Sequence, residues 1–217
     1  MWDGLTRTLL ILTFVTGILD AVSFIALGQV FVAMQTGNVI FLGIGIGGSA
    51  GAPVTAPLIS LLAFLAGAVV AALFVRPVRP GHPGALAGPV EIGLLGLATL
   101  LAALAAVEPG DFTAYLLIAI LAATMGLRNT IARRVGDPNV ATTVLNLTLT
   151  AFASHAPLAL ASPGELERRG AALAAILTGA LCGALLVKAS LTMALATAGG
   201  LVVLAAVTHA RAGAPAT

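Results

Sequence analysis

The run from Thr8 to Leu27 contains one ionisable residue, Asp20, and is otherwise built from apolar and small uncharged residues. A helix needs about 20 apolar residues to cross the hydrocarbon of a bilayer. Only 8% of the 217 residues are charged and 59% are hydrophobic, with a mean hydropathy of +1.11, whereas about 25% of the residues of a soluble domain are charged. The sequence therefore predicts an integral membrane protein whose main partner is the lipid bilayer.

The apolar runs are long and do not alternate with polar residues, which favours helices over barrel strands. Turns rich in proline and glycine separate them, as at Pro109-Gly110. We expect a single all-α membrane domain over residues 1–217. Its eight apolar segments are 8–27, 30–48, 56–75, 90–107, 112–131, 140–161, 171–187 and 191–208.

The distribution of basic residues distinguishes the possible topologies. If all eight segments cross, arginine and lysine show no preference for one side. If segments 30–48 and 140–161 enter and leave on the same side, all nine arginines share one side and Lys188 lies alone on the other. Basic residues mark the cytoplasmic side, so we expect about six transmembrane helices plus two re-entrant or broken helices, with both termini cytoplasmic. An alternative topology, in which only segment 140–161 is re-entrant and the N-terminus lies outside, gives nearly the same bias of basic residues toward one side.

Two pairs of segments indicate an internal duplication. Residues 17–21 (GILDA) resemble 126–130 (GLRNT), and residues 63–68 (AFLAGA) resemble 175–180 (AILTGA). These pairs give repeats of about 1–108 and 109–217. With three crossings in each half, the second repeat enters the membrane upside down. The expected architecture is thus an inverted 3+3 repeat, which is common in secondary transporters.

A carboxylate at membrane depth is costly, so it usually has a partner, faces a cavity or carries a proton. Arg128 is the best candidate partner for Asp20, because its neighbour Asn129 takes the place of Asp20 in the second repeat. The pair can bind a solute or ion, or only fix helix packing. Glu91 is expected in water at the start of a crossing, with a proton relay as the alternative.

Further polar residues interrupt two other apolar segments. Irregular backbone at membrane depth is tolerated only inside protein or beside a water-filled cavity, and residues 35–38 suit such a place. Residues 142, 146 and 150 recur every four residues and line one face of a helix. These groups either line a solute path or hydrogen-bond neighbouring helices. The candidate substrate- or ion-binding residues are Asp20, Gln35, Thr36, Asn38, Arg128, Asn129, Thr142, Asn146 and Thr150, and the candidate hinge or close-approach glycines are Gly17, Gly37 and Gly126.

Several functional classes lack support in the sequence. There is no basic stripe that would bind nucleic acid. Cys182 is the only cysteine, and the three histidines lie in separate regions, so we expect no metal site and no cofactor. An enzyme would need paired carboxylates, a metal cluster or a nucleophile with its base. None of these patterns appears, so we expect a protein without catalytic residues.

The polar motifs together resemble the YoaK family of bacterial multi-pass membrane proteins, which are built from a domain of unknown function. The resemblance rests on residues 17–21, 28–33 and 35–38 (QTGN), and on a second block at 125–129 (MGLRN) with 142–150 following. The resemblance implies a bacterial inner-membrane protein of six or seven spans, without an established substrate. The family commonly carries Gln-Asn where this chain has Arg128-Asn129, which leaves an anion-handling variant open.

These observations favour a small secondary transporter or permease for a small solute or ion, with Asp20 coupling a proton or cation. A chain of this length can also act as a homodimer. The alternatives are a non-transporting assembly or regulatory protein and, less favoured, a membrane-embedded enzyme.

Overall fold

The computed structural model describes residues 4–74, 87–135 and 163–212, and within these ranges the chain is helical without strands. This confirms the predicted all-α membrane protein. The helices are α1 (Gly4–Ala26), α2 (Gln35–Ile46), α3 (Thr55–Phe74), α4 (Ala87–Leu104), α5 (Phe112–Val135), α7 (Pro163–Ala189) and α8 (Leu191–Ala212).

Five of these helices, α1, α3, α5, α7 and α8, are long and apolar enough to cross a membrane. The apolar helix α4 is slightly shorter and packs against both α5 and α8. Helix α2 has 12 residues, so it reaches only about 18 Å and is too short for a bilayer core of about 30 Å. Its length agrees with the prediction that segment 30–48 is not a full crossing. Segment 140–161 lies outside the described residues.

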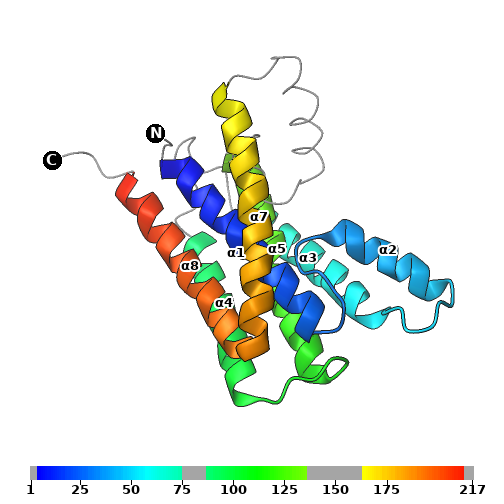
Figure 1. Ribbon diagram of the computed structural model, residues 1–217. Coiled ribbons are helices and arrows are strands. Elements are labelled where there is room, and N and C mark those ends of the chain that lie inside the picture. Colours follow the sequence, from blue (N-terminus) through cyan, green and yellow to red (C-terminus); the bar gives the residue numbers. More distant parts are fainter. Residues whose placement is uncertain (1–3, 75–86, 136–162, 213–217) are drawn as a thin grey trace.

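Helix α1 ends where two successive residues adopt positive φ angles, 114° at Gly28 and 55° at Gln29. This conformation is disfavoured for residues with a Cβ atom and cannot continue a right-handed helix. The chain then runs through the irregular segment 27–34 before α2 begins. Figure 1 shows that α2 projects away from the other helices, and it packs on α3.

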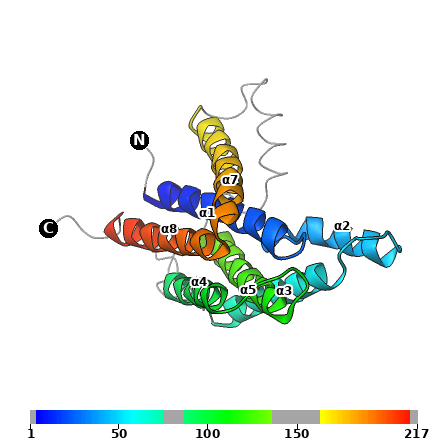
Figure 2. The ribbon, with the colours of Figure 1, turned by 60° about the horizontal axis from the view of Figure 1, so that its bottom comes forward.

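Helices α1 and α5 form the centre of the bundle. In the membrane-spanning part of each helix, 56% of α1 and 61% of α5 is buried inside the protein. The buried share is 28% or less in α3, α7 and α8. Helix α1 packs on α7 and α8, while α5 packs on α3 and α4. In Figure 2 the group α1, α7 and α8 lies above the group α3, α4 and α5. The largest fully buried side chains include Ile18, Leu19, Leu117, Ile118, Leu121 and Leu195.

Glycines allow two pairs of helices to approach closely. A Cβ atom added to Gly17 would overlap the carbonyl oxygen of Ile176 on α7. A Cβ atom added to Gly126 would overlap the carbonyl oxygen of Phe64 on α3. In both places the missing side chain lets two backbones approach closely.

Most of the basic residues of the described helices gather at one end of the bundle, apart from Lys188 at the end of α7 and the buried Arg128. Gly179 of α7 lies against Phe14 of α1, and Gly183 against Ile18, so these two helices run parallel. Helix α5 runs antiparallel to α1, and α1 begins at the end where α8 finishes (Figure 1). We call this the basic end. It carries Arg7 at the start of α1, Arg133 at the end of α5, and Arg168 and Arg169 at the start of α7.

Candidate functional site

Asp20 is buried in α1, with 7% of its surface exposed. Its Oδ1 accepts hydrogen bonds from the backbone amides of Val32, at 2.9 Å, and Ala33, at 2.8 Å. Both amides belong to the irregular segment 27–34, so the carboxylate supplies acceptors that a helix would otherwise provide. Asp20 therefore holds the chain where it turns back toward α2.

Asn38 binds the same segment from the other side and is fully buried. Its Oδ1 accepts a hydrogen bond from the Phe31 amide at 3.0 Å, and its Nδ2 donates one to the Phe31 carbonyl at 2.6 Å. The Nδ2 group also lies 2.9 Å from Gln35 Oε1 and 3.1 Å from Ser60 Oγ. All the hydrogen-bonding groups of this amide are thus used inside the protein.

Two further side chains complete this cluster. Gln35 donates to the Val32 carbonyl at 3.1 Å and to Ser60 Oγ at 3.2 Å. Ser60 of α3 donates in turn to the Phe31 carbonyl at 2.7 Å. Sequence reasoning missed Ser60, although a lone serine in the apolar segment 56–75 was the available signal. We call Asp20, Gln35, Asn38 and Ser60 the loop cluster.

The other two residues of the predicted 35–38 motif have different roles. Thr36 is exposed and lies outside the loop cluster. Gly37 lies beneath the ring of Phe31, where an added Cβ atom would approach the ring Cδ2 to 2.8 Å. That ring stacks on Phe24 and Phe41, with centroids 5.2 Å and 6.0 Å away. Gly37 therefore makes room for an aromatic stack.

Asn38→Asp is expected to lower the free energy of unfolding by more than about 2 kcal/mol, because a carboxylate oxygen would replace the donor that faces both the Phe31 carbonyl and Gln35 Oε1. The measurement is reversible unfolding in mixed micelles. Thr36→Ala, on the exposed side of the same turn, is the control and should change little. Equal stability of Asn38→Asp and the wild type would contradict the hydrogen-bond assignment.

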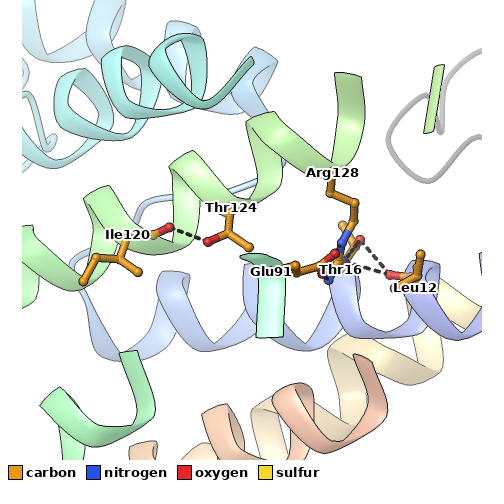
Figure 3. A network of polar contacts seen from close by, with 6 residues as sticks. All are labelled: Leu12, Thr16, Glu91, Ile120, Thr124 and Arg128. Carbon is orange, nitrogen blue, oxygen red and sulfur yellow. Dashed lines mark hydrogen bonds and ion pairs between the residues drawn. The ribbon is translucent and has the colours of Figure 1, made fainter. Parts of the chain in front are cut away.

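A second buried polar cluster joins three helices, as Figure 3 shows. Arg128 of α5 is 4% exposed and forms an ion pair with Glu91 of α4 through its Nε, at 2.7 Å, and its Nη2. Its Nη1 donates to Thr16 Oγ1 and to the Leu12 carbonyl of α1, both at 3.1 Å. We call Arg128, Glu91 and Thr16 the charge cluster.

The predicted pairing of Asp20 with Arg128 is wrong. Arg128 reaches α1 at Leu12 and Thr16, one turn nearer the basic end than Asp20, and its charge is balanced by Glu91. Asp20 is engaged instead by backbone amides. The expectation that Glu91 is solvated is also wrong, since only 5% of its surface is exposed. Thr16 and Asp20 are four residues apart, so they share one face of α1 and place the two clusters one above the other.

Of the remaining predicted residues, Asn129 alone belongs to the described part of the chain. Asn129 is half-buried beside Arg128 on α5. Thr142, Asn146 and Thr150 lie outside the described residues. Two pockets lie between the described helices, an apolar groove of about 430 Å³ between α4 and α8 and a pocket of about 250 Å³ at the end opposite the basic end. Asp20, Asn38 and Arg128 line neither of them.

The two clusters differ in net charge. Among the residues that the structure describes, the buried charged side chains are Asp20, Glu91 and Arg128. Glu91 and Arg128 neutralise each other, whereas Asp20 accepts hydrogen bonds from uncharged amides. Within the same ranges no group of three His, Cys, Asp or Glu side chains is placed to hold a metal ion. In the part of the interior that the structure describes, Asp20 is therefore the carboxylate without a charged partner, and it could take a proton or a cation.

The comparison with known families fits this membrane architecture. A family described as a protein of unknown function (DUF1275) matches residues 8–208. The chain belongs to this family. It is also 33% identical, over 150 residues, to the UPF0700 transmembrane protein YoaK of Bacillus subtilis (strain 168). The match covers 67% of this chain and 65% of that relative, just under two thirds of its length. No solved structure matches the chain.

Membership of the YoaK family confirms the resemblance predicted from the motifs around Asp20 and Asn38. It places the chain among transmembrane proteins. Within the family motif, Arg128 is the predicted departure, and here its charge is already neutralised by Glu91. An anion would have to displace Glu91 to bind at this arginine, which argues against a family variant that binds anions here.

Proposed function

We propose that this YoaK-family protein is a small secondary transporter or permease of the bacterial inner membrane, without enzymatic activity, that couples solute movement to a proton or cation at Asp20. The observation that carries the proposal is the uncompensated Asp20 carboxylate, which is buried at membrane depth beside irregular backbone. Ionisable residues within transmembrane segments are rare and mark ion pathways and proton relays. Discontinuous helices that bind ions through backbone and side chains are a feature of transporters.

The helix pairing supports an inverted repeat. In the repeat, α1 corresponds to α5, α3 to α7, and α4 to α8. In the first of these arrangements α1 packs on α7 and α8. In the equivalent arrangement α5 packs on α3 and α4, and this packing is also present. The glycine contacts follow the same correspondence, since Gly17 meets Ile176 and Gly126 meets Phe64. These are the residues that the sequence repeat pairs with one another. Two similar halves of opposite orientation can exchange conformations and so expose a shared site to either side in turn.

The orientation of the bundle follows from its charges. We propose that the basic end faces the cytoplasm, because arginine and lysine concentrate in cytoplasmic loops. The acidic residues Glu108 and Asp111, which lie between α4 and α5, then face the opposite side, as does Lys188 at the end of α7. This places both ends of the described chain, at Gly4 and Ala212, on the cytoplasmic side.

Asp20→Asn is the sharpest test of the function. An asparagine oxygen can still accept the hydrogen bonds from Val32 and Ala33, so the turn is retained while the charge is lost. We expect proton flux into proteoliposomes, followed with a trapped pH-sensitive dye in the presence of a panel of small solutes, to fall to the level of empty vesicles. A radioactive sodium uptake assay tests the cation alternative.

Thr36→Ala serves as the control, because the Thr36 side chain is exposed on the side of α2 that faces away from the loop cluster, and it should retain flux. If the wild-type protein moves neither protons, sodium nor any solute of the panel, and Asp20→Asn changes only thermal stability, the protein is an assembly or regulatory component instead. In that case the loop cluster serves packing alone.

A further inference from the structure

We propose that the Glu91–Arg128 ion pair keeps the α4–α5 interface closed toward the basic end, and that its release opens a path from that end to Asp20. The inference rests on the proposed transport function, for which it identifies the residues that control access. It assigns Glu91 and Arg128 a role in conformational control, not in solute binding.

The position of the ion pair carries the first part of the argument. Glu91 lies in the first third of α4 and Arg128 in the last third of α5, so the pair lies between the middle of the bundle and the basic end. Arg128 also binds Leu12 and Thr16 of α1. Three helices are therefore joined at one level, directly between the basic end and Asp20, which lies one turn further along α1.

The opposite end of the bundle is hollowed. A pocket of about 250 Å³ is lined there by Leu27, Gly28 and Tyr115, together with residues 53–56 and Gly110. Leu27 is fully buried and begins the segment that Asp20 holds. In the described part of the chain, the ion pair joins three helices toward the basic end and a recess lies at the other end. A carrier has this arrangement when its site faces away from the cytoplasm.

The two halves differ at equivalent interfaces, which gives the ion pair a directional effect. In the helix correspondence described above, the α4–α5 interface is equivalent to α8–α1. At the repeat offset of 109, Leu19 of α1 takes the place of Arg128. Offsets of 108–112 place the counterpart of Glu91 within residues 199–203, which are two glycines, a leucine and two valines. Only one of the two equivalent interfaces is held by charges, so the ion pair favours one of the two conformations.

Cysteine labelling tests the inference without knowledge of the solute. Cys182 is the only cysteine, so Cys182→Ser gives a background for single reporters. Thr124→Cys is the reporter, because Thr124 is fully buried on α5, one turn beyond Arg128 when seen from the basic end (Figure 3). Ala114→Cys is the matched control, because Ala114 is equally buried on the same helix near the opposite end. A membrane-impermeant thiol reagent is added to each face of proteoliposomes.

Glu91→Gln should raise the labelling rate of Thr124→Cys from the basic end by about tenfold or more, because losing one partner strongly disfavours the closed state. The Ala114→Cys rate should not change. Glu91→Asp, which keeps the charge but withdraws it by one methylene group, should give a smaller increase and guards against failure of Glu91→Gln to fold. The exchange Glu91→Arg with Arg128→Glu should return the rate toward that of the background protein.

Unchanged labelling of Thr124→Cys in both Glu91 variants would overturn the inference, as would equal increases at Thr124→Cys and Ala114→Cys, which indicate general loosening. This readout is separate from flux. Selective opening at Thr124 without any measurable transport supports the control of access by the ion pair while refuting the proposed function. Flux abolished by Asp20→Asn, with no change in labelling, refutes the control of access alone.

Discussion

Glu91→Leu is expected to lower the free energy of unfolding by about 3–5 kcal/mol, the cost of leaving one member of a buried ion pair without its partner. Arg128 would remain buried with 4% of its surface exposed and with only Thr16 and the Leu12 carbonyl as acceptors. A guanidinium group cannot lose its proton in a protein. The charge must therefore stay, and the helices around it must separate or admit water.

Arg128→Met should cost less than Glu91→Leu, because the remaining carboxyl group can take up a proton and become neutral. The double variant Glu91→Leu with Arg128→Met removes both charges and should regain most of the wild-type stability, since apolar residues of similar size often replace a buried ion pair without loss. Steric trapping in bicelles measures all three free energies. A double variant that is no more stable than Glu91→Leu alone would show that the pair is not the source of the effect.

Gly126→Ala is the second change with a large expected effect. The added methyl group would overlap the carbonyl oxygen of Phe64 and crowd the amide of Ala68, both backbone atoms that cannot rotate away. The α3–α5 crossing must then widen, which should lower the free energy of unfolding by about 1–3 kcal/mol or more. Gly17→Ala should behave in the same way at the α1–α7 crossing, where it meets Ile176 and Ala180.

Gly200→Ala is the matched control for these glycine variants. Gly200 lies within a helix, α8, but no heavy atom would lie within 4 Å of an added Cβ atom. The same chemical change should therefore leave the free energy of unfolding unchanged or raise it slightly, because alanine favours the helix. Equal losses for Gly126→Ala and Gly200→Ala would contradict the close backbone contact. The same unfolding assay in bicelles distinguishes the cases.

Much of the fold could be predicted from the sequence because the bilayer imposes simple rules. Apolar runs of sufficient length give the crossings, and Pro-Gly turns such as Pro109-Gly110 give their ends. The glycines at 17 and 126 were predictable as close-approach positions because their neighbourhoods resemble each other. The short length of α2 was foreseen from charge placement, since a full crossing of segment 30–48 would remove the bias of basic residues.

The partners of the buried polar residues were less predictable. Asp20, Gln35 and Asn38 were recognised as polar interruptions, and the structure brings them together around segment 27–34. Their partners are largely backbone groups, which a search among charged side chains overlooks. Glu91 was expected in water because hydropathy indicates the position of a residue along a helix axis. Hydropathy does not indicate which face of the helix the residue occupies. Its burial depends on the neighbours of α4, which are α5 and α8.

The pairing of α1 with α7 has a consequence for the synthesis of the protein. Helix α1 is synthesised well before α7, the helix on which it packs most closely and which begins at Pro163. The glycine face at Gly17 therefore precedes its partner surface. Segment 27–34 follows α1 directly and supplies the amides that Asp20 needs. The loop cluster can therefore form early and shield the carboxylate during membrane insertion. The α1–α7 contact must wait until the second half of the chain has been inserted.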